Sequence, residues 1–227
     1  MANKELLARL KLAVLEEGSV EDVEEAARAV VEGGVDINLA IDMATEAIRG
    51  VGDQFEAGDI YLPDLMIAAR KMERCMAILR PHIKAGEGHK SGGRIVIGTV
   101  SGDIHDIGKN LVSTMLAVRG FEVTDIGVNV PPLKFVAAAR DGGAHIIALS
   151  SLMTTSLPYQ QEVMAVLNEM ALRDRFYVIV GGGPVTAEFA AEIGADGWAE
   201  NASSAARLCE ILTTSGEKPP VAKTVIA

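Results

Sequence analysis

The chain has 227 residues, 49% of them apolar, which is enough for one large or two modest domains with a buried core. Its 31 acidic residues against 21 Lys and Arg give a formal net charge of −10, which argues against nucleic-acid partners. No apolar run approaches the roughly 20 residues that span a bilayer, and the first residues lack the apolar core of a signal peptide. We therefore expect a cytoplasmic protein without membrane contact.

Residues 1–84 show only helical patterns, and we expect a four-helix bundle there. Ser19 and Asp22 resemble a capping box, and Asp36 is placed to cap a third helix. Pro63 suits the first turn of a fourth helix, which Pro81 ends. The four helices are amphipathic and their connections are short, as in a small helical bundle.

The pattern changes after a polar, Gly-rich segment at residues 85–93, which we interpret as a linker. Five short apolar strands are expected at residues 94–100, 122–126, 145–149, 177–180 and 196–198. Helices are expected between and after them, at 109–119, 133–140, 158–172, 187–193 and 202–212. This alternation predicts an α/β, flavodoxin/Rossmann-like, doubly wound five-stranded parallel sheet over residues 94–214. Residues 215–227 are expected to form a loose C-terminal tail.

Ligands in such sheets bind beyond the carboxyl ends of the strands, where the strand order reverses. Three unusual loops fall at that edge: residues 101–108, 150–156 and 181–184. The first lacks the Gly-x-Gly-x-x-Gly of dinucleotide sites, and no phosphate-cradling loop ending in Lys-Ser or Lys-Thr is present. Ser150 stands where a phospho-acceptor receiver would carry an Asp. With these three kinds of site excluded, the remaining possibility is a ligand that is bound by the imidazole of His105.

The spacing Asp103-x-His105-x-x-Gly108 suits a metal-ligand loop. One imidazole nitrogen can bind the metal, and Asp103 can accept the N–H of the other, which fixes the tautomer. Gly108 allows a bulky planar ligand to approach the backbone. The alternative is a solvated histidine in a loop with helix-capping aspartates.

This loop is similar to the Asp-x-His-x-x-Gly signature of cobalamin-binding domains, which is followed by Ser-x-Leu and Gly-Gly. All three parts occur in order here, the second as Ser150 and Leu152 and the third as Gly181 and Gly182. The chain resembles the cobalamin-binding module of cobalamin-dependent methionine synthase. It is closer in layout to the small corrinoid methyl-carrier proteins of methyltransferase systems, and the similarity covers nearly the whole chain.

The resemblance implies that His105 is the lower axial ligand to cobalt, with the cofactor's own base displaced. The displaced nucleotide tail would pass between the sheet and its helices, where Gly181, Gly182 and Gly183 leave room. Ser156 would extend the His105–Asp103 hydrogen-bond chain into a proton relay. The expected cofactor-binding residues are Gly102, Asp103, Ile104, His105, Asp106, Ile107, Gly108, Ser150, Leu152, Thr154, Ser156, Gly181, Gly182, Gly183 and Ala202.

The resemblance also implies that the helical half is a cap that shields the upper face of cobalt. Phe55, Leu62 and Leu65 match the apolar shield by their spacing. Apolar side chains over a reactive cobalt–carbon bond exclude water. The alternative is that these three residues are ordinary core packing of the bundle.

The implied function is a methyl carrier on cobalt that is not catalytic alone. A substrate-specific methyltransferase would load the methyl group, and a second methyltransferase would pass it to tetrahydrofolate or a thiol. A reductive activation protein would be a further partner. The methyl donor is left open among methylamines, methanol, betaines and O-methyl aromatics.

Three other classes of protein are weighed. A radical mutase would need a substrate barrel, for which no segment is available. A cobalamin-dependent sensor would join a DNA-binding module to the cap, and none is expected before the first helix. A flavodoxin-like domain without corrinoid would require three separate loops to match by chance.

Overall fold

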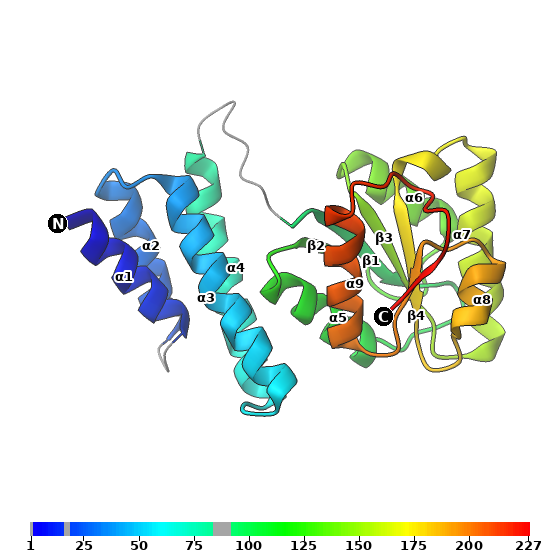
Figure 1. Cartoon of the computed structure of the whole chain (residues 1–227), viewed down its shortest axis with the longest axis horizontal. Coiled ribbons are helices and arrows are strands. Elements are labelled where there is room, and N and C mark those ends of the chain that lie inside the picture. Colours follow the sequence, from blue (N-terminus) through cyan, green and yellow to red (C-terminus); the bar gives the residue numbers. More distant parts are fainter. Residues whose placement is uncertain (1, 16–18, 84–91) are drawn as a thin grey trace. The chain divides into compact units, whose positions relative to one another are not determined.

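A computed structural model describes residues 2–15, 19–83 and 92–227 (Figure 1). The chain divides into two compact units. The first is built on the N-terminal helices, and the second, which begins at Gly92, contains the sheet. Residues 85–91 of the expected linker lie outside the described residues. Within the described part of the chain, none of the helices combines the length and the apolar character needed to cross a membrane.

The first unit contains the helices α1 (Ala2–Leu15), α2 (Val20–Glu32), α3 (Ile37–Ala57) and α4 (Leu62–Leu79), followed by a 3₁₀ turn at Arg80–His82. The Ser19 hydroxyl accepts from the Asp22 N–H at 3.2 Å, and the Asp22 carboxylate accepts from the Ser19 N–H at 2.7 Å, so the capping box is formed. Apolar side chains with almost no exposed surface fill the bundle, among them Leu10, Val23, Ile41, Ile48 and Leu79. The predicted N-terminal helical bundle is confirmed.

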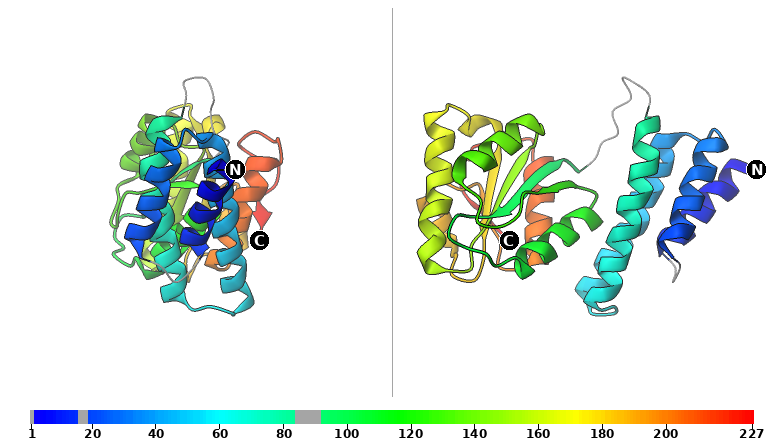
Figure 2. Two further views of the ribbon diagram at one scale, coloured as in Figure 1. Left: turned by 90° about the vertical axis from the view of Figure 1, so that its left-hand side faces the viewer. Right: turned by 180° about the vertical axis from the view of Figure 1, so that it is seen from behind.

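The second unit is a parallel sheet in the order β2-β1-β3-β4-β5-β6. Its strands are β1 (Arg94–Thr99), β2 (Glu122–Asp125), β3 (Ile146–Ser150), β4 (Tyr177–Gly181), β5 (Gly197–Trp198) and β6 (Val225–Ile226). The connecting helices are α5 (Ile107–Val118), α6 (Pro132–Asp141), α7 (Leu157–Glu169), α8 (Ala187–Glu192) and α9 (Ala202–Thr214). Figure 2 shows the helices on both faces of the sheet. The predicted doubly wound parallel sheet is confirmed.

Among the residues that the structure describes, the sheet has six strands, so the expectation of five is wrong by one. The additional strand β6 pairs in parallel with β5 at the edge of the sheet. The buried carboxylate of Asp196 accepts from the Val221 N–H at 2.8 Å, and the Asp196 carbonyl accepts from the Val225 N–H at 2.9 Å. These bonds hold the C-terminal segment against the sheet, where the sequence predicts a loose tail.

The two faces of the sheet are packed differently. The helices α6, α7 and α8 contribute to one continuous buried cluster, with Phe135, Val163 and Leu167 among its members. The opposite face, under α5 and α9, is filled less completely and encloses a cavity. The functional site is built on this second face.

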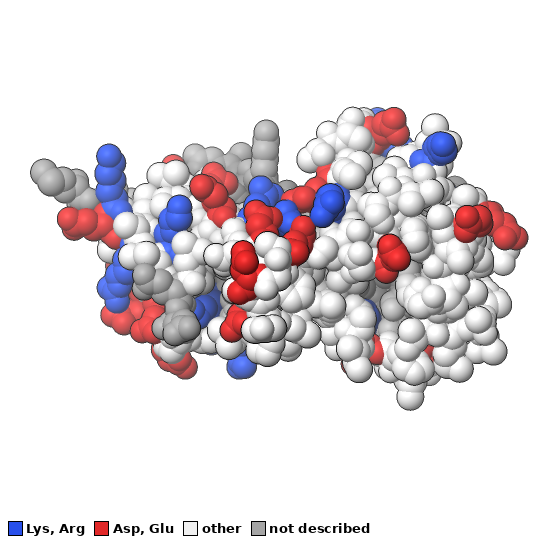
Figure 3. All heavy atoms as spheres, turned by 60° about the horizontal axis from the view of Figure 1, so that its bottom comes forward, with Lys and Arg blue, Asp and Glu red and all other residues white. Residues whose placement is uncertain are grey.

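Charged side chains are unevenly distributed over the face shown in Figure 3. Acidic and basic side chains are interspersed over the helical unit, while the sheet unit presents mostly uncharged atoms in this view. No basic stripe of the kind that binds nucleic acid is present on this face of the described residues.

Candidate functional site

A cavity of about 760 Å³ lies at the carboxyl ends of the strands, between the sheet and the helices α5 and α9. On the sheet side it is lined by Ile97, Ala148 and Ile179, which are direct register neighbours on β1, β3 and β4. Ala148 stands in the middle of this row, and its small side chain leaves space above the centre of the sheet. The volume falls within the range of small-molecule and cofactor sites.

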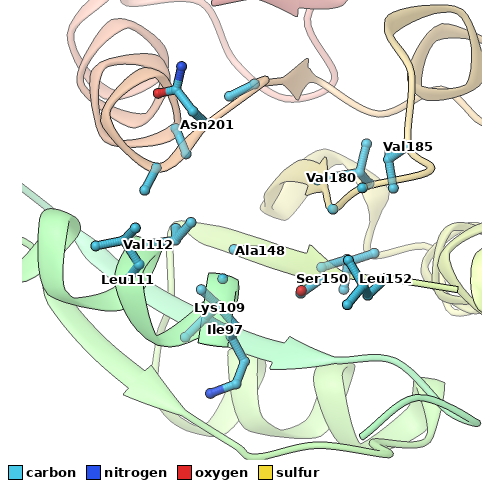
Figure 4. Close-up of a pocket in the computed structure, with 18 of the residues that line it drawn as sticks. Ile97, Lys109, Leu111, Val112, Ala148, Ser150, Leu152, Val180, Val185 and Asn201 are labelled. Carbon is cyan, nitrogen blue, oxygen red and sulfur yellow. The ribbon is translucent and has the colours of Figure 1, made fainter. Parts of the chain in front are cut away.

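The helical walls of the cavity are also apolar. Leu111 and Val112 come from α5, and Ala205 and Leu208 come from α9. Figure 4 shows the two α5 side chains on one side of the space and Asn201, at the start of α9, on the other. These walls suit an apolar ligand part, and the buried Lys109 on α5 is a charged member of the same lining.

The mouth of the cavity lies where the strand order reverses. The chain leaves β1 toward β2 and returns to β3 on the other side, so the loops after β1 and β3 diverge and leave a crevice. These two loops, the glycines after β4 and the segment before α9 line the mouth. The lining residues there are Ile104, His105, Asp106, Ile107, Gly108, Ser150, Leu152, Gly181, Gly182, Gly183, Glu200 and Ala202.

His105 lines the cavity with a side chain that is 51% exposed. Its Nδ1 lies 2.7 Å from Oδ1 of Asp103, whose side chain is fully buried. With an ionised carboxylate as partner, Nδ1 carries the proton, and the lone pair of Nε2 is left for another ligand. The pair presents an oriented imidazole ring to the cavity.

Asp103 is held by donors from both sides of the crevice. Oδ1 also accepts from the His105 N–H at 3.0 Å. Oδ2 accepts from the Leu152 N–H at 2.6 Å, the Met153 N–H at 3.2 Å and the Ser156 hydroxyl at 3.1 Å. These bonds tie the loop after β1 to the loop after β3.

The charge of Asp103 follows from these bonds. Burial by itself raises the pKa of this carboxyl group. Donation from the backbones of His105 and Leu152, and from the side chains of His105 and Ser156, outweighs burial and lowers the pKa to about 2. Asp103 is therefore ionised at neutral pH, as an acceptor for Nδ1–H must be.

Gly182 serves close packing between two loops. It has a φ of +124°, and a Cβ atom at this position would lie 1.8 Å from the carbonyl oxygen of Ser151. Gly181 differs, because a Cβ there would make only an ordinary contact with the Ala199 carbonyl at 3.7 Å. The sequence predicts that these glycines leave room for a ligand, and Gly181 is compatible with that explanation. Gly182 has a different reason, because the loop after β3 packs directly against its backbone.

The remaining predicted residues lie outside the cavity lining. Gly102, Asp103 and Ser156 stand behind His105 and support it, and Thr154 is exposed in the 3₁₀ turn Thr154–Ser156. Of the predicted shield, Leu65 is fully buried in the helical unit, Phe55 is half-buried, and Leu62 is 38% exposed. The shielding role of these three stays a prediction.

Sequence reasoning missed four residues that hold the loops in place. The buried Thr99 hydroxyl donates to the His105 carbonyl at 2.8 Å. The Asn129 side chain accepts from the Gly102 N–H at 2.8 Å. Gln160, fully buried on α7, donates to the Leu149 carbonyl in β3 at 3.1 Å and to the Gly181 carbonyl at 3.3 Å. Ser151 is the fourth. Only Asn129 carried a signal, as a polar residue in a turn after a strand.

A metal ion held by the protein alone needs several ligating side chains close together. Among residues 2–15, 19–83 and 92–227, no group of three or more His, Cys, Asp or Glu side chains is placed to hold a metal ion. One imidazole on a large apolar cavity suits a metal whose other ligands arrive with it, as in the ring of a corrinoid. The residues present fit such a cofactor.

Comparisons with known proteins agree with this assignment. Residues 93–207 match the model of the B12 binding domain, and residues 6–80 match a second B12 binding domain model. The dimethylamine corrinoid protein 1 of Methanosarcina acetivorans is 43% identical over 90% of this chain and 96% of its own length. A corrinoid protein of Desulfitobacterium hafniense is 41% identical over 89% and 95%.

A solved structure shows the same arrangement of elements. The methanol:cobalamin methyltransferase complex MtaBC of Methanosarcina barkeri contains a chain that superimposes with a TM-score of 0.83 at 28% identity. The match covers 96% of this chain and 84% of that one.

The fold, the cavity and the single imidazole define a protein that holds a metal-bearing cofactor at the carboxyl edge of its sheet. The two domain matches and the full-length relatives identify it further. The chain belongs to the B12-binding corrinoid proteins of methyltransferase systems, and its cofactor is cobalamin or a related corrinoid.

Proposed function

We propose that the chain carries a methyl group between two methyltransferases, with Nε2 of His105 as the protein ligand to cobalt. The observation that carries this proposal is a half-exposed imidazole on the cavity wall whose Nδ1 is bound by a buried carboxylate. The bound corrinoid supplies the cobalt that accepts and releases the methyl group, while the protein orients and encloses it.

The residues around His105 have separate tasks. Asp103 fixes the tautomer that leaves the Nε2 lone pair for cobalt and increases the electron density of the ring. The ionised Asp103 would also stabilise a proton held at Nε2 of His105 whenever that nitrogen was not bound to cobalt. Ser156 is the next member of this relay, at 3.1 Å from Asp103.

The apolar cavity is the proposed place of the displaced nucleotide tail. Gly181 and Gly183 line it without bulky side chains, and Ser150 adds a hydroxyl at its mouth. Ala202, at the start of α9, lines the cavity and would offer a backbone contact to the tail. An apolar interior of this size suits the uncharged base at the end of the tail.

The relatives support the choice of the first partner and of its methyl donor. Dimethylamine and trimethylamine corrinoid proteins are 40–50% identical to this chain, so a methylated amine is the methyl donor to test first. A methyltransferase specific for that donor would load the carrier. A second methyltransferase, acting on tetrahydrofolate or a thiol, and a reductive activation protein complete the proposal.

The test begins with the tagged full chain, loaded with hydroxocobalamin and used to capture partners from its source cells. The captured enzyme is mixed with the reduced carrier and, in turn, with trimethylamine, dimethylamine, monomethylamine or methanol. We expect one methylated amine to abolish the absorption of reduced cobalamin, and only when the captured enzyme is present. No change with any donor, or capture of a DNA-binding protein or a mutase barrel, would overturn the proposal.

A further inference from the structure

Two buried hydroxyl groups continue the hydrogen-bond chain beyond Asp103. Ser156, at the end of the 3₁₀ turn, is 1% exposed, and Ser151, immediately after β3, has no exposed surface. Their hydroxyl oxygens are 2.7 Å apart. Ser151 stands between the two residues of the Ser-x-Leu motif and has no role in the function proposed above.

The hydroxyl groups of Ser151 and Ser156 can donate only one hydrogen bond each, and more acceptors than that lie within reach. The single Ser156 proton can go to Oδ2 of Asp103 at 3.1 Å, to the Met153 carbonyl at 2.8 Å or to Ser151. The Ser151 proton can go to Ser156 or to the Met153 carbonyl at 3.2 Å. Because the Met153 carbonyl is the nearer of the two oxygens, Ser156 does not reach Asp103 by proximity alone.

One arrangement gives Asp103 its hydroxyl donor and also satisfies Ser156. In it, Ser151 donates to Ser156, and Ser156 donates to Asp103. A hydroxyl that accepts a hydrogen bond becomes a stronger donor, so the two bonds reinforce each other. If the Ser151 hydroxyl is removed, the Ser156 oxygen loses the donor that lies 2.7 Å away. The Met153 carbonyl then competes more effectively with Asp103 for the Ser156 proton.

The backbone of Ser151 is fixed by the neighbouring loop. Its N–H donates to the Gly181 carbonyl at 3.0 Å, and its carbonyl lies so close to Gly182 that no side chain fits there. The position of the Ser151 hydroxyl is therefore set by the loop after β4, which lines the cavity. This contact joins the cavity wall to the hydrogen bonds behind His105.

We infer that Ser151 is a positioning residue that turns the Ser156 hydroxyl toward Asp103 and thereby sets how strongly His105 donates to cobalt. The inference rests on the proposed ligation of cobalt by His105. When Asp103 loses the Ser156 donor, its carboxylate is a stronger acceptor for Nδ1–H, and the imidazole is a stronger ligand. Removal of the Ser151 hydroxyl thus favours the ligated form of cobalt(II) over cobalt(I), which binds few axial ligands.

The test uses the full chain loaded with hydroxocobalamin and reduced to cobalt(II). Electron paramagnetic resonance measures the ratio of imidazole-ligated to unligated cobalt, and a redox titration measures the cobalt(II)/cobalt(I) midpoint potential. In Ser151→Ala we expect the ratio to rise about threefold. A one-electron midpoint shifts by 59 mV for each tenfold change, so it should become more negative by up to about 30 mV, the limit reached when ligated cobalt(II) predominates. Thr155→Ala, which removes an exposed hydroxyl from the same turn, should match the wild type.

A double-mutant cycle distinguishes action through Ser156 from a general structural effect. In the Ser156→Ala background, Ser151→Ala should cause no further shift. An equal further shift would overturn the inference. Ser151→Cys, similar in size but a weak donor, should shift both measurements in the same direction by less.

Wild-type values in both the Ser151→Ala and Ser151→Cys variants would also overturn the inference. The proposed function fails differently. A wild-type protein without any imidazole signal on cobalt would disprove ligation by His105, whereas a clear wild-type signal with unchanged Ser151 variants would disprove only the role of Ser151.

Discussion

Oδ1 of Asp103 lies 2.7 Å from Nδ1 of His105, and the carboxylate is fully buried while the imidazole is half exposed. This asymmetry determines what each residue does. The buried carboxylate is held by donors from the loops after β1 and β3, so it fixes the direction of the ring. The exposed side of the ring belongs to the cavity lining.

Asp103→Asn should weaken cofactor binding. The amide keeps the size of the carboxylate but loses its charge and replaces one acceptor oxygen with an NH2 donor, so the His105 ring is no longer held in one tautomer. Loss of such a partner typically costs 10–100-fold in affinity, and we expect an effect in that range. The measurement is an anaerobic absorption titration with hydroxocobalamin. Asp174→Asn, an exposed site on the same unit, is the control. Equal affinities for both variants would contradict the account.

The stability of the sheet unit should depend on the ionisation of Asp103. Its pKa is lowered from 3.8 to about 2, so it stabilises the folded state above pH 4. That contribution is lost as the pH falls from about 4 to about 2, and the shift corresponds to ~2.5 kcal/mol. Urea unfolding from pH 6 to about 2, followed through Trp198, the single tryptophan, reports on this unit. An identical pH dependence in Asp103→Asn would contradict the assignment.

Gly182→Ala should destabilise the sheet unit strongly. A Cβ atom there would lie 1.8 Å from the Ser151 carbonyl, in a backbone conformation with φ +124°. Strain and overpacking together should cost about 3 kcal/mol or more. Gly181→Ala is the matched comparison, since its Cβ meets only the Ala199 carbonyl at 3.7 Å. We expect Gly181→Ala to change the unfolding midpoint little in urea. A smaller loss in Gly182→Ala than in Gly181→Ala would refute this explanation.

Deletion of residues 221–227 should weaken cobalamin binding. The Ala227 N–H donates to the Trp198 carbonyl at 3.1 Å, and the Ala227 carbonyl accepts from Glu200. Both partners line the cavity, so β6 braces its wall. Loss of these two backbone bonds, together with the bonds of Val221 and Val225 to Asp196, should lower the affinity about tenfold. Lys223→Ala, an exposed change in the same segment, should bind like the wild type. Unaltered binding after the deletion would show that β6 does not support the site.

Most of the fold was predictable because its strands are apolar and its helices are capped. The expected strand at residues 177–180 is β4 (Tyr177–Gly181), and the predicted capping box at Ser19 is formed. β6 was not predictable, since a two-residue strand has no periodicity. It forms because the buried Asp196, far away in the sequence, binds the segment that contains Val221.

The candidate site was predictable only where a motif carries it. The spacing of Asp103 and His105 is local, so the sequence could indicate their pairing. The bonds of Thr99 and Gln160 to backbone carbonyls depend on how separate strands and helices come together. The same holds for Gly182, whose approach to Ser151 exists only after β3 and β4 have paired. Sequence patterns contain no sign of such contacts.

The most direct test of the central claim is the electron paramagnetic resonance spectrum of the full chain loaded with hydroxocobalamin and reduced to cobalt(II). One sample carries histidine labelled with the heavy nitrogen isotope. If Nε2 of His105 binds cobalt, the triplet splitting of each line becomes a doublet in the labelled protein, and His105→Ala loses this response. A triplet that persists after labelling would mean that the cofactor keeps its own base on cobalt, which would contradict the account.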